Sequence, residues 1–326
     1  MKVDIPAVSI VMPLFNKEEE VSRAIRSVLS QTVQDFELIV INDGATDKSS
    51  LVVNKFVEAR IRIIDQENAG VSAARNRGIS EAGSDLIAFL DADDEWAPDF
   101  LETILRLRER FSSCRVFATR YFFCSPDGQQ RLATVRGLPA GFLDGVMHGY
   151  FDIASLSDPP LWTSAVAVEK GALMEIGGFP VGTTSGEDLL TWARLAMRYE
   201  IAYNNEPKAF FWGPIRVSDR PGRIPQEPDI VGDSLKELLN KADSSTLPGL
   251  KAYIALWHRM RAVIFIQLGE SQKAVDELRK VTDYSEMGLK LFTLRALAHM
   301  PGGLSATALK FLKRMNYKIF HQRTVR

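Results

Sequence analysis

The sequence predicts an α/β fold, in which a doubly wound, mostly parallel sheet is followed by a C-terminal helical region. Apolar segments alternate with helix-like segments four times in about ninety residues, a rhythm typical of parallel sheets with crossover helices. Each apolar segment ends abruptly in polar residues, as strands do at the ligand-binding edge of such a sheet. The pattern then turns purely helical, so we expect one domain over residues 1–228 and a helical region over residues 229–326.

Composition narrows the class of protein. The chain has 326 residues and a net charge of -1, so a general binder of nucleic acid is not expected. Its two cysteines, Cys114 and Cys124, do not make a disulfide framework; we interpret them as small buried side chains, which suits a reducing compartment. No run of about 18 apolar residues and no signal-peptide core is visible. These features predict a cytoplasmic protein.

The first strand and helix are marked by a change of hydrophobic period. Residues 8–12 form a β-rich run that Pro13 stops. Residues 14–17 then form a loop, and apolar residues at helical spacing between 21 and 29 predict the first helix.

Two further strands follow in the same manner. Residues 36–41 are apolar and end in polar residues, where Gly44 marks a turn and Thr46 or Asp47 can cap the next helix. Residues 61–64 are the third strand. Residues 67–70 turn the chain into a helix that carries Arg75.

The fourth strand, residues 86–90, ends in a run of acidic side chains. Crowded carboxylates repel one another unless a cation lies among them. We expect an extended backbone that turns Asp91 and Asp93 to the same side. Oxygen ligands of this kind suit Mg²⁺ or Mn²⁺, which predicts a metal–diphosphate site. The alternative is a polar loop that caps a helix with Pro98 in its first turn.

Four polar loops are therefore expected to meet in one crevice at the carboxyl ends of the strands: residues 13–16, Asp43, residues 70–75 and residues 91–93. The sequence lacks G-x-G-x-x-G after the first strand and lacks a P-loop motif, which disfavours a dinucleotide oxidoreductase and a P-loop enzyme. A diphosphate would then be held by the metal and by Arg75 or helix-start amides.

A set of ordered motifs resembles the family 2 inverting glycosyltransferases of the GT-A fold. The motifs are residues 9–16 with the acidic residues 18–20, residues 36–47, residues 68–78, residues 89–94, residues 177–179 and residues 186–189. Ala45 departs from the family pattern, where serine is usual. The resemblance fixes neither the sugar nor the acceptor.

The resemblance implies roles for individual residues. The residues that would bind the nucleotide-sugar donor belong to the first four motifs: Pro13, Leu14, Phe15, Asn16, Glu18, Asp43, Gly70, Ala74, Arg75, Asp91 and Ala92. Asp93 matches the main protein ligand of Mn²⁺ or Mg²⁺, and Asp188 matches the general base, with Glu187 beside it. Without the resemblance, residues 187 and 188 read as ordinary acidic residues at a helix start, where the helix dipole stabilises a carboxylate.

The later segments leave alternatives open. Trp162 is either a stacking platform for a sugar or a core tryptophan. Arg216 or Arg220 either closes over the diphosphate or is a solvated loop charge. The basic, amphipathic tail, residues 301–326, either contacts an anionic membrane surface or packs on the domain.

The leading hypothesis is a metal-dependent, inverting glycosyltransferase that moves a sugar from a nucleotide-sugar, most simply a UDP-sugar. The acceptor would be a glycan or lipid-linked glycan in surface polysaccharide biosynthesis. The second hypothesis is a weakly catalytic scaffold that acts through its helical region. A nucleotidyltransferase is the third, and it is disfavoured because residues 14–16 are not a glycine-rich phosphate loop.

Overall fold

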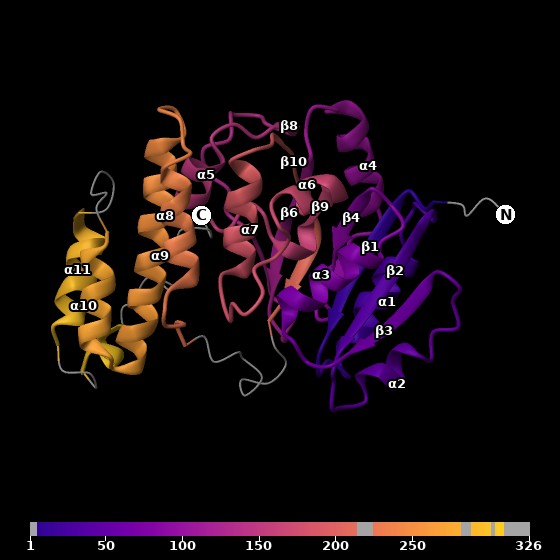
Figure 1. Ribbon diagram of the computed structural model, residues 1–326, viewed down its shortest axis with the longest axis horizontal. Helices are drawn as coiled ribbons and strands as arrows, with labels where there is room; N and C mark the ends of the chain where they lie inside the picture. The colour runs from indigo at the N-terminus through magenta and orange to yellow at the C-terminus, as the bar shows by residue number, and fades with distance from the viewer. Residues whose placement is uncertain (1–4, 214–223, 282–287, 301–303, 310–326) are drawn as a thin grey trace. The chain divides into compact units, whose positions relative to one another are not determined.

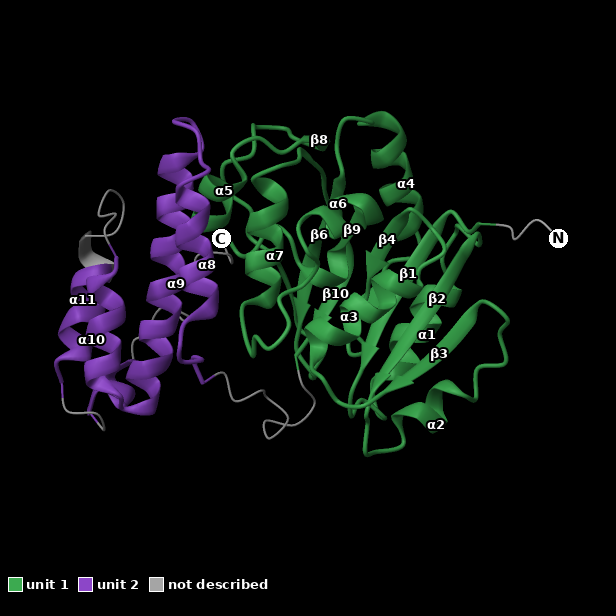
Figure 2. Ribbon diagram, in the orientation of Figure 1, with its two compact units in different colours: residues 1–221 green, residues 222–326 purple. Residues whose placement is uncertain are grey.

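The computed structural model describes residues 5–213, 224–281, 288–300 and 304–309. The chain forms two compact units, residues 1–221 and 222–326 (Figure 1, Figure 2). The domain boundary predicted after residue 228 lies inside the second unit and stays a prediction.

Unit 1 is built on one large sheet with the strand order β3-β2-β1-β4-β9-β6-β10-β5, to which β7 adds beside β6 and β8 beside β10. Parallel pairing joins β3, β2, β1 and β4, and it also joins β6 and β10, whereas β9 runs antiparallel between β4 and β6. The predicted α/β fold is therefore confirmed. The strands are β1 (Val8–Leu14), β2 (Phe36–Asp43), β3 (Ile61–Gln66), β4 (Leu86–Phe89), β5 (Glu95–Trp96), β6 (Val116–Cys124), β7 (Gln130–Leu132), β8 (Asp144–Val146), β9 (Val166–Glu169) and β10 (Ile201–Trp212).

Helices cover both faces of this sheet (Figure 1). Alternate residues of β1, such as Ile10 and Met12, share a core with α1 and α4, while Val11 points to the other face. There α3 lies so close that a Cβ at Gly78 would be 2.3 Å from a methyl carbon of Val11. The helices of unit 1 are α1 (Val21–Leu29), α2 (Ser49–Val53), α3 (Val71–Glu81), α4 (Phe100–Arg110), α5 (Tyr150–Leu156), α6 (Lys170–Glu175) and α7 (Glu187–Ala196), with a 3₁₀ turn at Thr163–Ala165.

Aromatic packing fixes α7 against the sheet. Phe89 of β4 makes an edge contact with Phe179, at 5.3 Å between ring centroids, and Phe179 makes another with Trp192 of α7 at 5.7 Å. Large aromatic contacts of this kind stabilise a helix position beyond simple area burial. The first turn of α7 is thereby held near the end of β4.

Two short turns shape the later strands of unit 1. Residues 125–128 form the turn of the antiparallel β6–β7 pair. Residues 163–165 form the 3₁₀ turn that precedes β9, and the Ser164 hydroxyl in this turn donates a hydrogen bond to Asp94.

Unit 2 is helical over its described part, as the sequence predicts. It contains α8 (Ile230–Leu239), α9 (Leu247–Leu268), α10 (Ser271–Arg279) and α11 (Gly288–Ala298). Gly269, at φ 79°, ends α9 in a left-handed conformation that favours glycine, and it lets α10 pack back on α9. Among the described helices, none combines the length and the apolar character needed to cross a bilayer. Most of the tail predicted to contact a membrane, residues 301–326, lies outside the described residues.

Candidate functional site

The loop after β1 is tied to the loop after β2. Asn16, at φ 52°, accepts hydrogen bonds through Oδ1 from the Thr46 amide at 2.8 Å and from the Asp47 amide at 3.4 Å. Glu18 Oε2 accepts from the Lys48 amide at 2.9 Å. These two predicted donor-binding residues thus hold the edge of the site together.

Other residues of this first loop differ in their access to a ligand. The side chain of Leu14 is fully buried in the core, so it is unavailable to a donor, and Pro13 is partly buried. Phe15 is 46% exposed and offers an apolar face at the edge of the sheet.

Asp43, the last residue of β2, organises the start of α3. Its buried carboxylate accepts hydrogen bonds from Gln66 Nε2 at 2.7 Å, from the Ala69 amide at 2.9 Å and from the Gly70 amide at 2.9 Å. Gly70, at φ 87°, is the N-cap residue directly before α3, and Ala74 is buried within that helix. A carboxylate has about four acceptor positions, so Asp43 keeps capacity for one further donor.

Arg75 of α3 joins segments far apart in the sequence. Its buried guanidinium lies 2.8 Å from Asp91 Oδ1 and 3.2 Å from Glu187 Oε1, and it packs over the Phe179 ring at 5.1 Å. Burial alone would lower the pKa of Arg75, but Asp91 and Glu187 raise it above its usual range. A permanently charged arginine therefore connects the end of β4 with the start of α7.

The acidic run after β4 is a turn, so the expected extended backbone is wrong. The Asp94 amide donates to the Asp91 carbonyl at 3.0 Å, which closes the turn, and Ala92 is buried within it. As a result the two carboxylates have different partners: Asp91 pairs with Arg75, and Asp93 Oδ2 lies 2.7 Å from Lys17 Nζ.

Sequence reasoning missed the role of Asp94. Its buried carboxylate accepts hydrogen bonds from Ser164 Oγ, from Trp162 Nε1 at 3.2 Å and from the Trp212 amide at 3.1 Å. Burial first, and then Asp93 and Asp91, raise the pKa of Asp94 well above its usual range. The one available signal was that four acids directly follow a buried strand, where not all of them can reach water.

Trp162 lies in an aromatic cluster. Its ring is 4.5 Å from the Phe211 ring and 5.6 Å from the Tyr121 ring between centroids, and it is partly buried against the core. This placement suits a structural tryptophan, and its predicted contact with a sugar stays a prediction.

Asp188 lies in the first turn of α7. Its Oδ1 accepts from the Leu189 amide at 2.7 Å. Burial first, and then the neighbouring charge of Glu187, raise the pKa of Asp188 to about 7, against lowering by Arg75 and by the Leu189 amide. The charge of Asp91 raises it further, which places Asp188 within electrostatic reach of the turn after β4. Arg216 and Arg220 lie outside the described residues.

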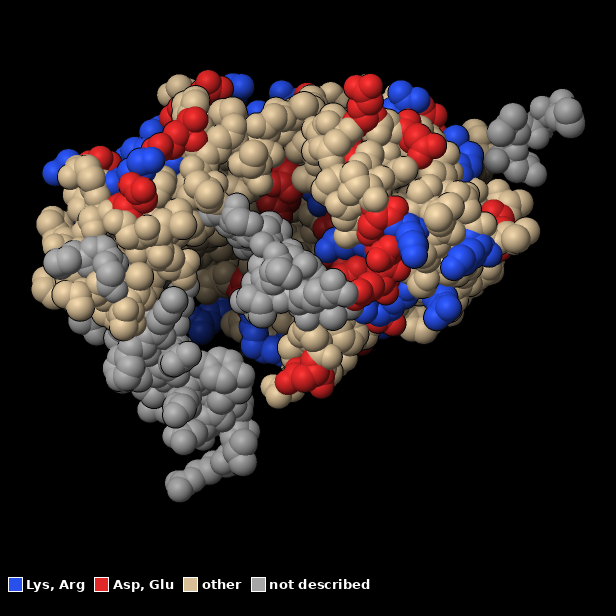
Figure 3. Space-filling view, turned by 90° about the horizontal axis from the view of Figure 1, so that it is seen from below, with Lys and Arg blue, Asp and Glu red and all other residues tan. Residues whose placement is uncertain are grey.

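The chemistry of this cluster fits a divalent cation at Asp93. Carboxylate oxygens are the ligands that Mg²⁺ and Mn²⁺ prefer, and the Asp93 side chain is 28% exposed, so an ion can reach it. Acidic and basic side chains lie next to one another on the face seen from below (Figure 3). Within the site, Lys17 beside Asp93 and Arg75 beside Asp91 provide both signs of charge, as a metal–diphosphate ligand requires.

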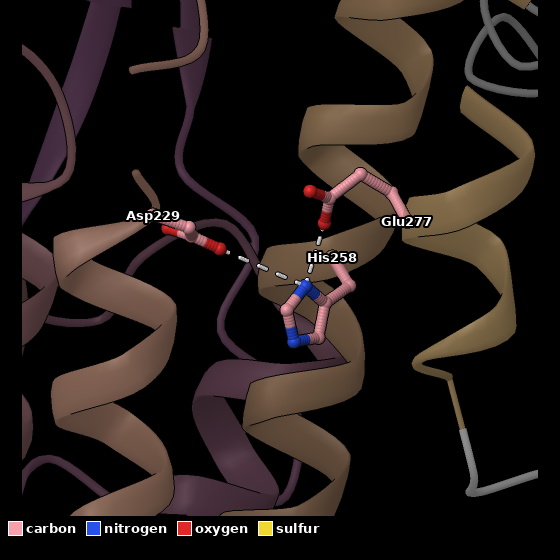
Figure 4. A group of neighbouring side chains, drawn as sticks. All are labelled: Asp229, His258 and Glu277. Carbon is pink, nitrogen blue, oxygen red and sulfur yellow. Dashed lines mark hydrogen bonds and ion pairs between the residues drawn. The ribbon is translucent and has the colours of Figure 1, made fainter. Parts of the chain in front are cut away.

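Unit 2 has a second buried cluster, made of Asp229, His258 and Glu277 (Figure 4). His258 Nδ1 lies 2.7 Å from Glu277 Oε2. Arg261 Nε lies 3.0 Å from Glu277 Oε1 and 3.3 Å from Asp229 Oδ2, and Lys280 also pairs with Glu277. The three residues could offer ligand atoms to a metal, but Arg261 already supplies a cation to both carboxylates. We interpret the cluster as a structural ion network.

This network predicts acid sensitivity. Burial alone would raise the pKa of Glu277, but the His258 hydrogen bond, the Arg261 charge and Lys280 lower it to about 2. A lowered pKa contributes stability that is present above about pH 4.5 and is lost as the pH falls toward 2. The shift of Glu277 corresponds to a loss of roughly 3 kcal/mol in the free energy of unfolding. We expect urea unfolding, followed by helical ellipticity, to show a steep loss over this pH window in the native chain.

Two variants test whether Glu277 causes this pH dependence: Glu277→Gln removes its charge, and Glu237→Gln, at an exposed position of α8, is the control. Glu277→Gln should be less stable at pH 6 and show a flatter profile, whereas Glu237→Gln should keep the native profile. A native profile in Glu277→Gln would contradict the assignment.

Residues 9–152 match the family described as Glycosyl transferase family 2. The chain is 32% identical over 123 residues to glycosyltransferase GlyA of Streptococcus pneumoniae, and 37% identical over 106 residues to the putative glycosyltransferase EpsH of Bacillus subtilis. These alignments cover 37% and 32% of this chain but only 18% and 31% of the relatives, so the chain spans a minor part of their length.

Solved structures share the fold over most of the chain. TarS residues 1–349 of S. aureus, in complex with UDP-GlcNAc, match with a TM-score of 0.67 and 16% identity over 93% of this chain and 88% of that one. The mannosyltransferase PcManGT of Pyrobaculum calidifontis, in complex with GDP-Man and Mn²⁺, matches with a TM-score of 0.58 and 17% identity over 97% and 87%. At such identities the likeness shows the fold.

Proposed function

We propose that this chain, a member of glycosyl transferase family 2, transfers a sugar from a nucleotide-sugar donor, a UDP-sugar, to a hydroxyl acceptor with inversion at the anomeric carbon. The observation that carries the proposal is the chain of contacts from Asp91 through Arg75 to Glu187, which holds Asp188 near the turn that contains Asp93. The acceptor class is a glycan or lipid-linked glycan of a surface polysaccharide.

The residues divide between donor and acceptor. Asp93 would hold Mn²⁺ or Mg²⁺, and when bound such an ion supplies positive charge to the leaving diphosphate. Asp43 and the exposed Phe15 would hold the nucleoside, and Arg75 would keep Asp91 in place beside it. Phe15 follows β1, Asp43 ends β2, and Asp91 and Asp93 follow β4, so these residues lie at the carboxyl ends of strands, where open α/β sheets bind ligands.

Asp188 is the base in this proposal. An acceptor hydroxyl has a high pKa and must lose its proton as it attacks, so a carboxylate in its line of attack lowers the barrier. A carboxyl group with a pKa of about 7 is better matched to this task at neutral pH than an ordinary aspartate. Attack by an activated acceptor on the face opposite the leaving diphosphate gives a single displacement and inversion.

A thermal-shift screen tests the donor class. UDP-, GDP-, CDP- and dTDP-sugars are added to the full chain with Mn²⁺ or Mg²⁺, and free sugar with metal serves as the control. A UDP-sugar at about 100 times its Kd should stabilise the native state by about 2.7 kcal/mol and raise the Tm, because it binds only that state. No shift with any nucleotide-sugar would remove the proposed function, and a shift with GDP-sugars alone would reassign the donor.

A further inference from the structure

Lys17 forms an ion pair with Asp93, the residue proposed to bind the metal ion. It belongs to the loop between β1 and α1, and its Nζ is 2.7 Å from Asp93 Oδ2. Both side chains are partly exposed, at 25% for Lys17 and 28% for Asp93. The pair is therefore accessible to solutes, unlike the buried Arg75 pairs.

The backbone around Lys17 is held firmly. Its amide donates to Ser49 Oγ at 2.7 Å, and its carbonyl accepts from the Val21 amide at 3.0 Å as α1 begins. The side chain extends from this fixed point toward Asp93, with the carboxylates of Glu20 and Asp91 within its electrostatic range. A lysine on a flexible four-carbon stem can change position while its backbone stays in place.

We infer that Lys17 is a resident counter-ion of Asp93, which a divalent metal must displace, and that its released ammonium then binds the donor diphosphate. The inference rests on the proposed function and adds a residue that the sequence motifs do not assign. An ammonium and a divalent ion repel strongly at the short distance that a shared carboxylate imposes. A diphosphate relieves this repulsion because it brings negative charge to both cations.

The arrangement makes metal and donor binding cooperative. Without nucleotide, Lys17 opposes the metal; with nucleotide, the same charge favours the complex. Because such coupling is reciprocal, UDP should tighten Mn²⁺ binding by the same factor as Mn²⁺ tightens UDP binding. Removal of the charge at residue 17 should reduce that factor.

The test measures binding rather than turnover. Mn²⁺ affinity is followed by electron paramagnetic resonance of the full chain, with and without UDP, in the native protein and in Lys17→Met, Lys17→Gln and Lys17→Arg. Without UDP we expect Lys17→Met and Lys17→Gln to bind Mn²⁺ about three- to tenfold more tightly, and Lys17→Arg to resemble the native protein. UDP affinity at saturating Mn²⁺ should fall in the two neutral variants.

Lys48→Met is the matched control, because Lys48 is an exposed lysine on the neighbouring loop and lies outside the proposed pair. Its Mn²⁺ affinity should stay native, which separates the Asp93 pair from the general charge of the surface. Unchanged or weaker Mn²⁺ binding in both neutral Lys17 variants would overturn the inference. If the native chain itself bound neither Mn²⁺ nor UDP, the proposed function would fail instead.

Discussion

Replacement of Asp188 by Asn should lower kcat by about 10²–10⁴-fold and leave UDP-sugar binding close to native. The amide keeps the shape of the side chain and its place in the first turn of α7, but it cannot accept the proton of the acceptor hydroxyl. Single-turnover transfer and equilibrium donor binding, measured on the same preparation, separate the two effects. Native turnover in Asp188→Asn would remove Asp188 as the base.

The proposed role of Asp188 also predicts how the transfer rate depends on pH. Because the pKa of Asp188 is raised to about 7, the carboxylate form proposed to act as base accumulates only as the pH rises through 7, and kcat should rise with it. Glu187→Gln should move this rise of kcat to lower pH, since the charge of Glu187 is the second largest cause that raises the pKa of Asp188. The residual activity of Asp188→Asn should not show this rise of kcat with pH.

The melting temperature of Asp188→Asn shows whether a loss of activity comes from lost catalysis or from unfolding. A carboxyl group whose pKa is raised in the native state destabilises that state as the pH rises from about 4 through 7, because its ionised form is disfavoured there. Asn cannot ionise, so Asp188→Asn should melt at a temperature no lower than that of the native protein at pH 8. An inactive variant with a native or higher Tm therefore points to catalysis.

Replacement of Asp93 by Ala should remove the metal dependence of donor binding and lower kcat/KM by about 10²-fold or more. The substitution deletes the carboxylate proposed to hold the ion and leaves the Arg75 pairs in place. Isothermal titration of UDP with and without Mn²⁺ measures the difference that the metal makes. We expect a clear difference in the native protein and none in Asp93→Ala.

Asp85→Asn is the matched control for this experiment. Asp85 is an exposed carboxylate just before β4, at the opposite end of the strand from Asp93. It should keep both the metal dependence and the native rate. UDP affinity that responds to Mn²⁺ equally in Asp93→Ala and in the native chain would refute the metal role.

The sequence predicted the strands of the parallel sheet and the start of α7 because these depend on local patterns. The apolar runs predicted over residues 8–12, 36–41 and 86–90 are buried strands, although β1 continues through Pro13 to Leu14 and β2 continues to Asp43. Residues 187 and 188 begin an apolar-faced helix. Side-chain period and turn residues act over a few positions, so they can be read without knowledge of the fold. The topology rule then placed four loops at one edge of the sheet.

Only the tertiary structure decided which charges meet. The sequence could not show that Arg75 lies between Asp91 and Glu187, or that the turn after β4 separates Asp91 from Asp93. Nor could it show that Asp94 is buried and accepts a hydrogen bond from Trp162. These pairings join residues that are up to 112 positions apart in the sequence, so they depend on how the elements pack. The cost of burying an unpaired charge then selects the partners, and that cost exists only once the interior has formed.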